Sequence, residues 1–197
     1  AIEDIAIMRS LPNIKILHPY DNISSKYSVD FAYKSNSPVY IKLDKGFYEN
    51  IFSKPGDNLL SFPQKKNKKI LIITTGVIVH KIERIVNKLN KIGLKTDLLN
   101  IFFIKHNKSK IEENIRKYKT IVTIEEQNLP GGLGSIIAEI IADKNLNIFF
   151  KRFGIDDRYI LNCGNRDWLQ KQYELDSDNL FKKIKLFCKP LYLGKTF

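Results

Sequence analysis

The stretch EEQNLPGGLGS, residues 125–135, brings together the residue types best suited to chemistry in this sequence. Two adjacent acids, Glu125 and Glu126, precede a glycine cluster that runs into an apolar helical pattern. Such a stretch can serve as a phosphate-binding loop, an acid–base pair, or a tight turn between a strand and a helix. A P-loop needs Lys followed by Ser or Thr, and a dinucleotide-binding loop needs GxGxxG; this stretch has neither.

The two glutamates are poorly placed for acid–base work, because neighbours on a strand point to opposite faces. Gly131, Gly132 and Gly134 instead suit a tight turn with close backbone approach. Ser135 or the loop residue Asn128 can accept hydrogen bonds from the free N–H groups at the helix start. The glutamates can help to fix the loop near that positive helix end. We therefore predict a structural turn, and we assign no catalytic residue in it.

The cysteines and histidines form no recognisable metal site in the sequence. Cys163 and Cys188 share no ligand spacing with each other or with the three histidines, so we predict no metal site. His18 ends an expected strand with no paired carboxylate in view, and we expect a structural role for it. We expect His80 and His106 to be solvated.

Two further candidates have simple interpretations. Asp44 precedes Lys45, and we expect the two to pair on the surface, where such a pair contributes roughly 0 to 1 kcal/mol. Trp168 has Leu169 and Tyr173 nearby, which favours packing over ligand stacking.

Composition indicates a globular protein with a core: 43% of residues are hydrophobic and 27% are charged. The net charge of +12 would suit a polyanion. The lysines are scattered, however, and the one dense run, QKKNKK at 64–69, falls in a polar stretch, so we predict no nucleic-acid partner. No apolar run approaches the roughly 18 to 20 residues that cross a bilayer, and the N-terminus lacks a signal pattern. We expect a cytoplasmic protein without membrane contact.

Apolar spacing divides the chain into two α/β blocks. The first has helical patterns at 2–11 and after Asp21 or Asn22, and strands at 14–19 and 38–43. This alternation predicts parallel pairing, because each helix carries the chain back across the sheet. Residues 46–69 show no sustained period and are typical of a linker.

The second block is a longer strand–helix alternation. We expect strands at 69–76, 95–104, 120–126 and 147–155, with helices at 79–92, 108–118, 134–143, 166–173 and 178–187. The fold class is therefore α/β: an incomplete parallel segment followed by a complete three-layer α/β/α domain.

Two segments resemble one enzyme family. AIEDIAIMRSLPN, residues 1–13, resembles the segment of transketolases that directly follows a thiamine-site histidine in a GPTHQ-type run. TIVTIEEQNLPGGLGSIIAEIIA, residues 120–142, resembles the central motif of the C-terminal domain of that family. The first motif is specific to transketolases, above all the shorter type found as two sections. The second is also similar to deoxyxylulose phosphate synthase and to the beta subunit of pyruvate dehydrogenase.

The resemblance covers about residues 1–187 and implies a domain organisation. Residues 1–46 would end a thiamine-diphosphate pyrimidine-binding domain, 47–68 would be a linker, 69–188 would be a transketolase C-terminal domain, and 189–197 a tail. The family also implies thiamine diphosphate and Mg²⁺ in the complete enzyme, a homodimer, and a part for the 125–134 turn in subunit contact.

The function implied is transfer of a two-carbon ketol unit between sugar phosphates in carbohydrate metabolism. The family has a site for the cofactor's diphosphate and Mg²⁺, and a glutamate that activates the cofactor. Neither has a counterpart in this sequence. We therefore expect the chain to be inactive alone, to bind no cofactor alone, and to need an N-terminal portion or subunit. Lys45 stands where the family has an arginine that binds substrate phosphate, and a lysine can still act there as a point charge.

Two alternatives remain open. The chain can be a non-catalytic dimerisation or regulatory module of a related enzyme such as deoxyxylulose phosphate synthase. It can also be a basic α/β protein that binds nucleic acid.

Overall fold

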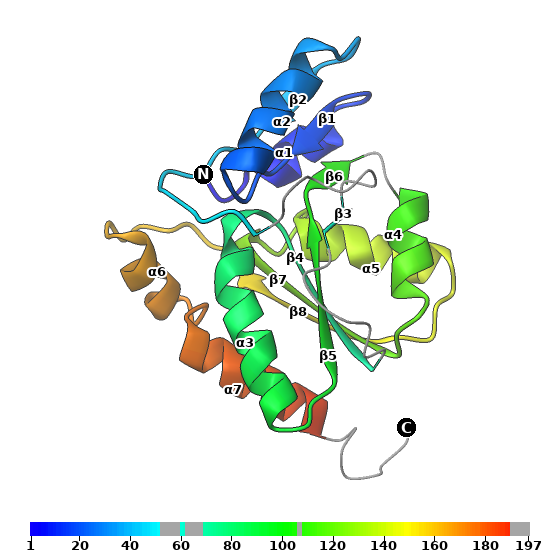
Figure 1. Ribbon diagram of the computed structural model, residues 1–197, viewed down its shortest axis with the longest axis vertical. Helices are drawn as coiled ribbons and strands as arrows, with labels where there is room; N and C mark the ends of the chain where they lie inside the picture. Colours follow the sequence, from blue (N-terminus) through cyan, green and yellow to red (C-terminus); the bar gives the residue numbers. More distant parts are fainter. Residues whose placement is uncertain (52–59, 62–68, 106–107, 190–197) are drawn as a thin grey trace.

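The computed structural model describes residues 1–51, 60–61, 69–105 and 108–189 of the 197-residue chain. The N-terminal segment lies at one end of a larger α/β body, and strands of both parts run toward their junction (Figure 1). Among the described residues, no helix has the length and apolar character needed to cross a membrane.

The N-terminal segment alternates helices and strands as expected. Its elements are α1 (Asp4–Ser10), β1 (Lys15–Leu17), α2 (Asn22–Tyr33) and β2 (Val39–Ile41). β1 and β2 pair in parallel, with Ile16 opposite Tyr40, because α2 returns the chain to the same end of the sheet. Asp21 caps α2 by accepting a 2.8 Å hydrogen bond from the backbone N–H of Ser24.

The single strand expected at 95–104 is wrong. It divides at the buried Phe102 into β5 (Thr96–Ile101) and β6 (Phe103–Lys105). β5 stays in the larger sheet, while β6 pairs antiparallel with β1 and completes a sheet of order β2-β1-β6. The apolar run continues through the division, so hydrophobic periodicity alone cannot detect it.

The larger sheet has the strand order β3-β5-β4-β7-β8. Its further strands are β3 (Leu60–Ser61), β4 (Ile70–Thr74), β7 (Thr120–Asn128) and β8 (Phe149–Ile155). β3 is antiparallel to β5, and the other neighbours are parallel. β3 falls within the stretch expected as a linker.

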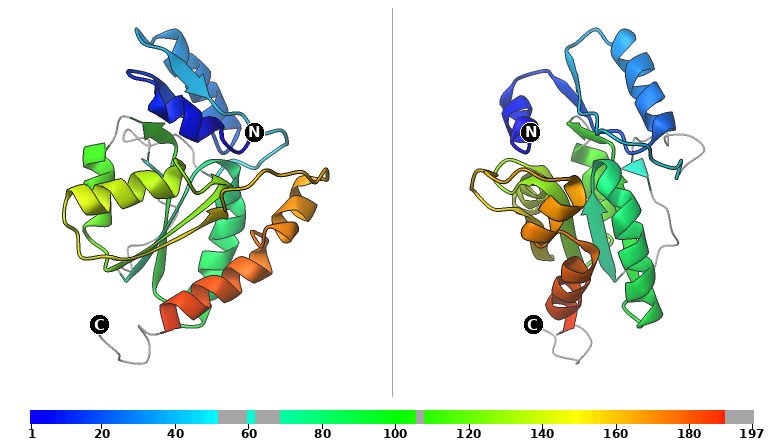
Figure 2. Two further views of the ribbon diagram at one scale, coloured as in Figure 1. Left: turned by 180° about the vertical axis from the view of Figure 1, so that it is seen from behind. Right: turned by 90° about the vertical axis from the view of Figure 1, so that its left-hand side faces the viewer.

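Helices cover both faces of this sheet and give the expected three layers. They are α3 (Val79–Lys91), preceded by a 3₁₀ turn η1 (Gly76–Ile78), then α4 (Lys108–Ile115), α5 (Leu133–Asp143), α6 (Arg166–Gln172) and α7 (Ser177–Cys188). In the view from behind, α5 lies in front of the strands and α3 beyond them (Figure 2).

Strand alternation builds a core on each face. Ile70 and Ile72 of β4 share one apolar cluster with α3 and α7, while Leu71 and Ile73 share the other with α4 and α5. All five β4 residues are buried, as expected of a parallel strand covered on both faces.

Candidate functional site

A cleft of about 630 Å³ opens where the N-terminal segment meets the larger domain. The residues after β2 form one wall, the carboxyl ends of β7 and β8 form the floor, and α6 forms the other wall. The carboxyl ends of parallel strands are where α/β folds place ligand sites, because loops converge there. The polar residues of the cleft are Lys42, Asp44, Lys45, Glu126, Gln127, Asn165, Arg166 and Gln170.

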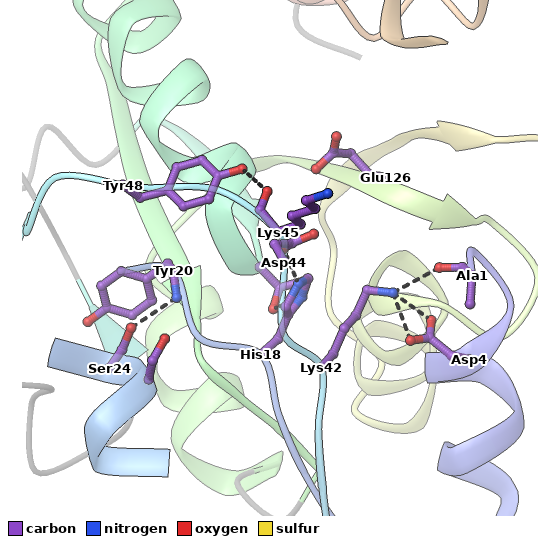
Figure 3. A network of polar contacts seen from close by, with 12 residues as sticks. Ala1, Asp4, His18, Tyr20, Ser24, Lys42, Asp44, Lys45, Tyr48 and Glu126 are labelled. Atoms are coloured by element: carbon purple, nitrogen blue, oxygen red, sulfur yellow. Dashed lines mark hydrogen bonds and ion pairs between the residues drawn. The ribbon is translucent and has the colours of Figure 1, made fainter. Parts of the chain in front are cut away.

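His18 has a carboxylate partner, contrary to the expectation from sequence. Its Nε2 lies 3.0 Å from Oδ2 of Asp44 (Figure 3). Its Nδ1 lies 3.3 Å from Oγ1 of Thr75. The Thr75 hydroxyl donates to the carbonyl of Ile101 at 2.7 Å. His18 is only 2% exposed, and its two contacts join the end of β1 to residues that follow β2 and β4.

Asp44 pairs with His18 and Arg166 rather than with Lys45, so the expected Asp44–Lys45 pair is wrong. Its Oδ1 lies 3.2 Å from Nη1 of Arg166. Burial acts to raise the pKa of Asp44, but the His18 hydrogen bond and the charges of His18, Arg166 and Lys42 outweigh it and lower that pKa to about 2. Asp44 is therefore an anion at neutral pH, fixed on both sides.

Arg166 joins the two walls of the cleft. Its Nε donates to Oε1 of Glu126 at 2.8 Å, and its Nη2 donates to Oε2 of the same carboxylate. Its Nη1 also donates to the hydroxyl of Tyr48 at 3.1 Å. Burial acts to lower the pKa of Arg166. The hydrogen bond and charge of Glu126, followed by the charge of Asp44, outweigh burial and raise that pKa above its usual value, so the guanidinium stays charged.

Sequence reasoning missed Arg166, although the sequence holds a signal for it. Asn165 caps α6 by accepting from the N–H of Trp168, which makes Arg166 the first helical residue. A cation there opposes the helix dipole. Its presence indicates that nearby carboxylates hold it, as Glu126 and Asp44 do.

Lys42 and Lys45 both line the cleft but differ in their partners (Figure 3). The amino group of Lys42 donates to Oδ2 of Asp4 at 2.7 Å and to the carbonyl of Ala1 at 2.9 Å. Lys45 is exposed, and within the described ranges no carboxylate pairs with it. Lys45 is thus the cation of this wall that is available to an anionic ligand.

Gln127 adds a buried polar group to the cleft. Its side chain is 3% exposed, and its Oε1 has no hydrogen-bond partner within the part of the chain described. Nothing in the sequence pattern marked this residue.

Glu125 and Glu126 point to opposite faces of β7. The Oε2 of Glu125 accepts from the N–H of Leu133 at 2.6 Å and its Oε1 from that of Gly134 at 2.8 Å, at the start of α5. Glu126 faces Arg166. Burial is the largest influence on Glu125 and raises its pKa to about 7, although the two backbone hydrogen bonds and the charges of Arg152 and Arg9 oppose the shift.

The glycines of the turn allow this capping. Gly131 has a φ of 74°, and a Cβ on Gly132 would lie 2.1 Å from Oε2 of Glu125. Ser135 accepts from the N–H of Gly131 at 3.0 Å. Asn128, the alternative to Ser135 for accepting such an N–H group, does not do so, because its Oδ1 is buried without a partner among the described residues.

The remaining candidates lie outside the cleft or on its rim. Nε2 of His80 lies 2.8 Å from the carbonyl of Tyr20, and its ring stacks on Tyr48, so the expectation of a solvated His80 is wrong. His106 lies outside the described residues. Trp168 is 42% exposed, and Cys163 and Cys188 are not bonded to each other.

Within residues 1–51, 60–61, 69–105 and 108–189, no three His, Cys, Asp or Glu side chains lie together as metal ligands. These residues therefore do not fit the Mg²⁺ of a diphosphate cofactor on their own.

A family comparison decides the relationship. The model described as "Transketolase, C-terminal domain" matches residues 63–180, more than half of the chain. The chain belongs to this family. The resemblance expected from the motifs at 1–13 and 120–142 is thereby confirmed.

Curated relatives extend the match beyond that domain. The chain is 30% identical over 91% of its length to a protein of Actinobacillus succinogenes named as one subunit of apulose-4-phosphate transketolase. It is 32% identical over 92% of its length to a protein of Methanocaldococcus jannaschii named as a transketolase C-terminal section. It is also 30% identical over 97% of its length to 1-deoxy-D-xylulose-5-phosphate synthase of Halothermothrix orenii. The chain spans 59%, 58% and 31% of the lengths of these relatives.

Solved structures confirm the fold class. A split-gene transketolase described as an inactive beta4 tetramer superposes with a TM-score of 0.85 at 24% identity, over 96% of this chain and 62% of that one. A Pichia stipitis transketolase mutant superposes with a TM-score of 0.77 at 18% identity, over 98% of this chain and 28% of that one.

Proposed function

We propose that the chain is the C-terminal part of a thiamine-diphosphate-dependent transketolase that moves a two-carbon ketol unit between sugar phosphates. The observation that carries this proposal is the continuous match of over nine tenths of the chain to one subunit of a transketolase and to a transketolase C-terminal section. Both names describe one part of a divided enzyme. We further propose that an N-terminal section or subunit is the obligate partner.

The partner and this chain would contribute different parts of the active site. Transketolases and deoxyxylulose phosphate synthases depend on thiamine diphosphate, and the bound cofactor supplies an electron sink for a carbanion. The partner would hold its diphosphate and Mg²⁺. This chain would supply one wall of the substrate channel and the groups that orient the sugar phosphate, without activity of its own.

Lys45 is the residue proposed to bind substrate phosphate. It lines the cleft, it is exposed, and the neighbouring Lys42 is already engaged by Asp4. A lysine at this position provides charge without the bidentate geometry of arginine. Lys45→Ala in the reconstituted enzyme is expected to raise the KM for a sugar phosphate about tenfold, the loss of one charge-assisted contact. An unchanged KM would remove this role.

The function is tested by reconstitution. The chain is mixed with the N-terminal section, thiamine diphosphate and Mg²⁺, and ketol transfer from a ketose phosphate to an aldose phosphate is followed. Activity is expected only in the complete mixture. If the N-terminal section transfers ketol units equally well without this chain, the chain is the non-catalytic module of the alternative interpretation.

Assembly as a homodimer, through the 125–134 turn and α5, and a cytoplasmic location are further parts of the proposal. The isoleucine-rich α5 supports the first, since Ile141 packs against the core but is only partly buried. Sedimentation of the chain, alone and with its partner, tests the oligomeric state.

A further inference from the structure

Arg166 holds the segment that carries Lys45. Three residues from two parts of the chain accept hydrogen bonds from its guanidinium: Glu126 at the end of β7, and Asp44 and Tyr48 after β2. Its side chain is two thirds buried, so water competes weakly for these donors. Because its Nε, Nη1 and Nη2 are all occupied by protein groups, Arg166 is suited to positioning rather than to binding a ligand.

The segment 44–48 is fixed at several points around Lys45. Asp44 is held between Arg166 and His18, at 3.2 and 3.0 Å. The Tyr48 hydroxyl accepts from Arg166 and donates to the carbonyl of Lys45 at 3.4 Å. The Tyr48 ring stacks on His80 with centroids 5.5 Å apart. Gly46, at φ 144°, allows the chain to turn between these anchors.

This arrangement sets the direction of the Lys45 side chain, which extends to the same side as Glu126 (Figure 3). A lysine carries its ammonium on a flexible four-carbon stem, so a backbone that is already held in place lowers the entropy cost of binding an anion. These contacts join two parts of the chain. Arg166 and Glu126 belong to the C-terminal domain, while Lys45 belongs to the N-terminal segment.

We propose that Arg166 is a positioning residue that fixes Lys45 at the phosphate end of the substrate and so lets the C-terminal domain set the preference for phosphorylated sugars. This inference rests on the proposed function, in that it names the regulation of substrate choice at the same cleft. It assigns no contact between Arg166 and the substrate.

The kinetic test uses Arg166→Lys and Arg166→Gln in the reconstituted enzyme, with a ketose phosphate and the same ketose without phosphate. The KM for the phosphorylated ketose is expected to rise about tenfold in both variants, because one charge-assisted contact is misplaced. The kcat and the KM for the unphosphorylated ketose should stay within about twofold. A KM that rises equally for both sugars, or for neither, would overturn the inference.

Arg116→Gln is the matched control. Arg116 also pairs with a glutamate, Glu112 of α4, at 2.5 Å, but it directly follows the end of α4, away from the cleft. Its replacement is expected to leave both KM values unchanged. A tenfold rise in the control would mean that loss of any arginine–glutamate pair has this effect, which would contradict the assignment to Arg166.

Backbone ¹⁵N relaxation on the chain alone separates this inference from the proposed function. Arg166→Gln is expected to lower the order parameters of the amides at 44–48 without changing those of α3, while Arg116→Gln changes neither. Unchanged order parameters at 44–48 overturn the inference, whatever the enzyme assay gives. If the segment loosens but the wild-type mixture transfers no ketol unit, the anchoring stands and the proposed function fails.

Discussion

Polar and charged side chains at the cleft contact one another in a continuous series. His18 contacts Asp44, Asp44 contacts Arg166, and Arg166 contacts Glu126, so the series crosses from the N-terminal segment to the larger domain. Each member is at least partly buried, where an unpaired charge would be costly. Lys45 is not a member of this series. Its side chain is exposed, so its ammonium is accessible to an anion.

Glu125 gives a residue-scale prediction about pH. Burial raises its pKa from 4.5 to about 7, so the folded state binds this proton more tightly than the unfolded state. The stability that this proton contributes is therefore complete below about pH 4.5 and is lost as pH rises through about 7. In urea titrations, the free energy of unfolding of the wild type, relative to Glu125→Gln, should fall over that range.

The control for this prediction is Glu113→Gln on the exposed side of α4, where the carboxylate is 73% exposed. It accounts for loss of a surface charge. A difference between the wild type and Glu125→Gln that stays flat from about pH 5 to about pH 8 would contradict the raised pKa.

At the scale of elements, the turn from β7 to α5 depends on close approach at Gly132. A Cβ there would lie 2.1 Å from Glu125 Oε2 and 2.6 Å from the carbonyl oxygen of Asn128. Gly132→Ala is expected to lower the free energy of unfolding by about 2 to 3 kcal/mol, because the capping carboxylate must move. Urea denaturation measures the change.

Gly93→Ala separates this clash from backbone strain. Gly93 ends α3 at φ 87° with nothing within 4 Å of an added Cβ. It should cost about 1 kcal/mol through its left-handed conformation alone. Equal losses at Gly93 and Gly132 would contradict the close contact with Glu125.

Elements with strong local signals were predictable from the sequence. Ile82, Ile85, Val86 and Leu89 all lie on the buried face of α3, as their spacing predicts, and Gly93 follows its end. The division of β5 from β6 was not predictable, because the run is apolar throughout and the change of partner depends on β1, about 85 residues earlier in the chain.

The candidate site was less predictable, for a physical reason. Motif resemblance singled out Lys45 and the turn at 125–134, since both depend on local sequence. The pairing of His18 with Asp44, and of Arg166 with Glu126, depends on side chains 26 and 40 residues apart that only the fold brings together. Asp44 lies too far from His18 along the chain for a local sequence pattern to pair them.

At the scale of the whole molecule, the N-terminal segment and the larger domain are joined by a shared sheet as well as by hydrogen bonds. β6 belongs by sequence to the second part but pairs with β1 of the first. Asn128 donates its backbone N–H to the carbonyl of Ile2 at 3.0 Å, and Arg9 donates to the carbonyl of Gly131 at 3.1 Å. These contacts should couple the stability of both parts.

We expect a single cooperative unfolding transition for that reason. Trp168, the one tryptophan, reports on α6. Its fluorescence, far-UV circular dichroism and hydrogen exchange at residues 15–17 should share one urea midpoint. Loss of protection at 15–17 at a lower urea concentration would show that the N-terminal segment unfolds independently, contrary to this expectation.

The most direct test of the central claim follows the two-carbon unit itself. A ketose phosphate labelled with ¹³C at its first two carbons is mixed with an aldose phosphate, thiamine diphosphate, Mg²⁺, the N-terminal section and this chain. The account predicts that the label appears in the lengthened sugar phosphate only when both chains are present. Label transfer at the same rate without this chain, or none in the complete mixture, would contradict it.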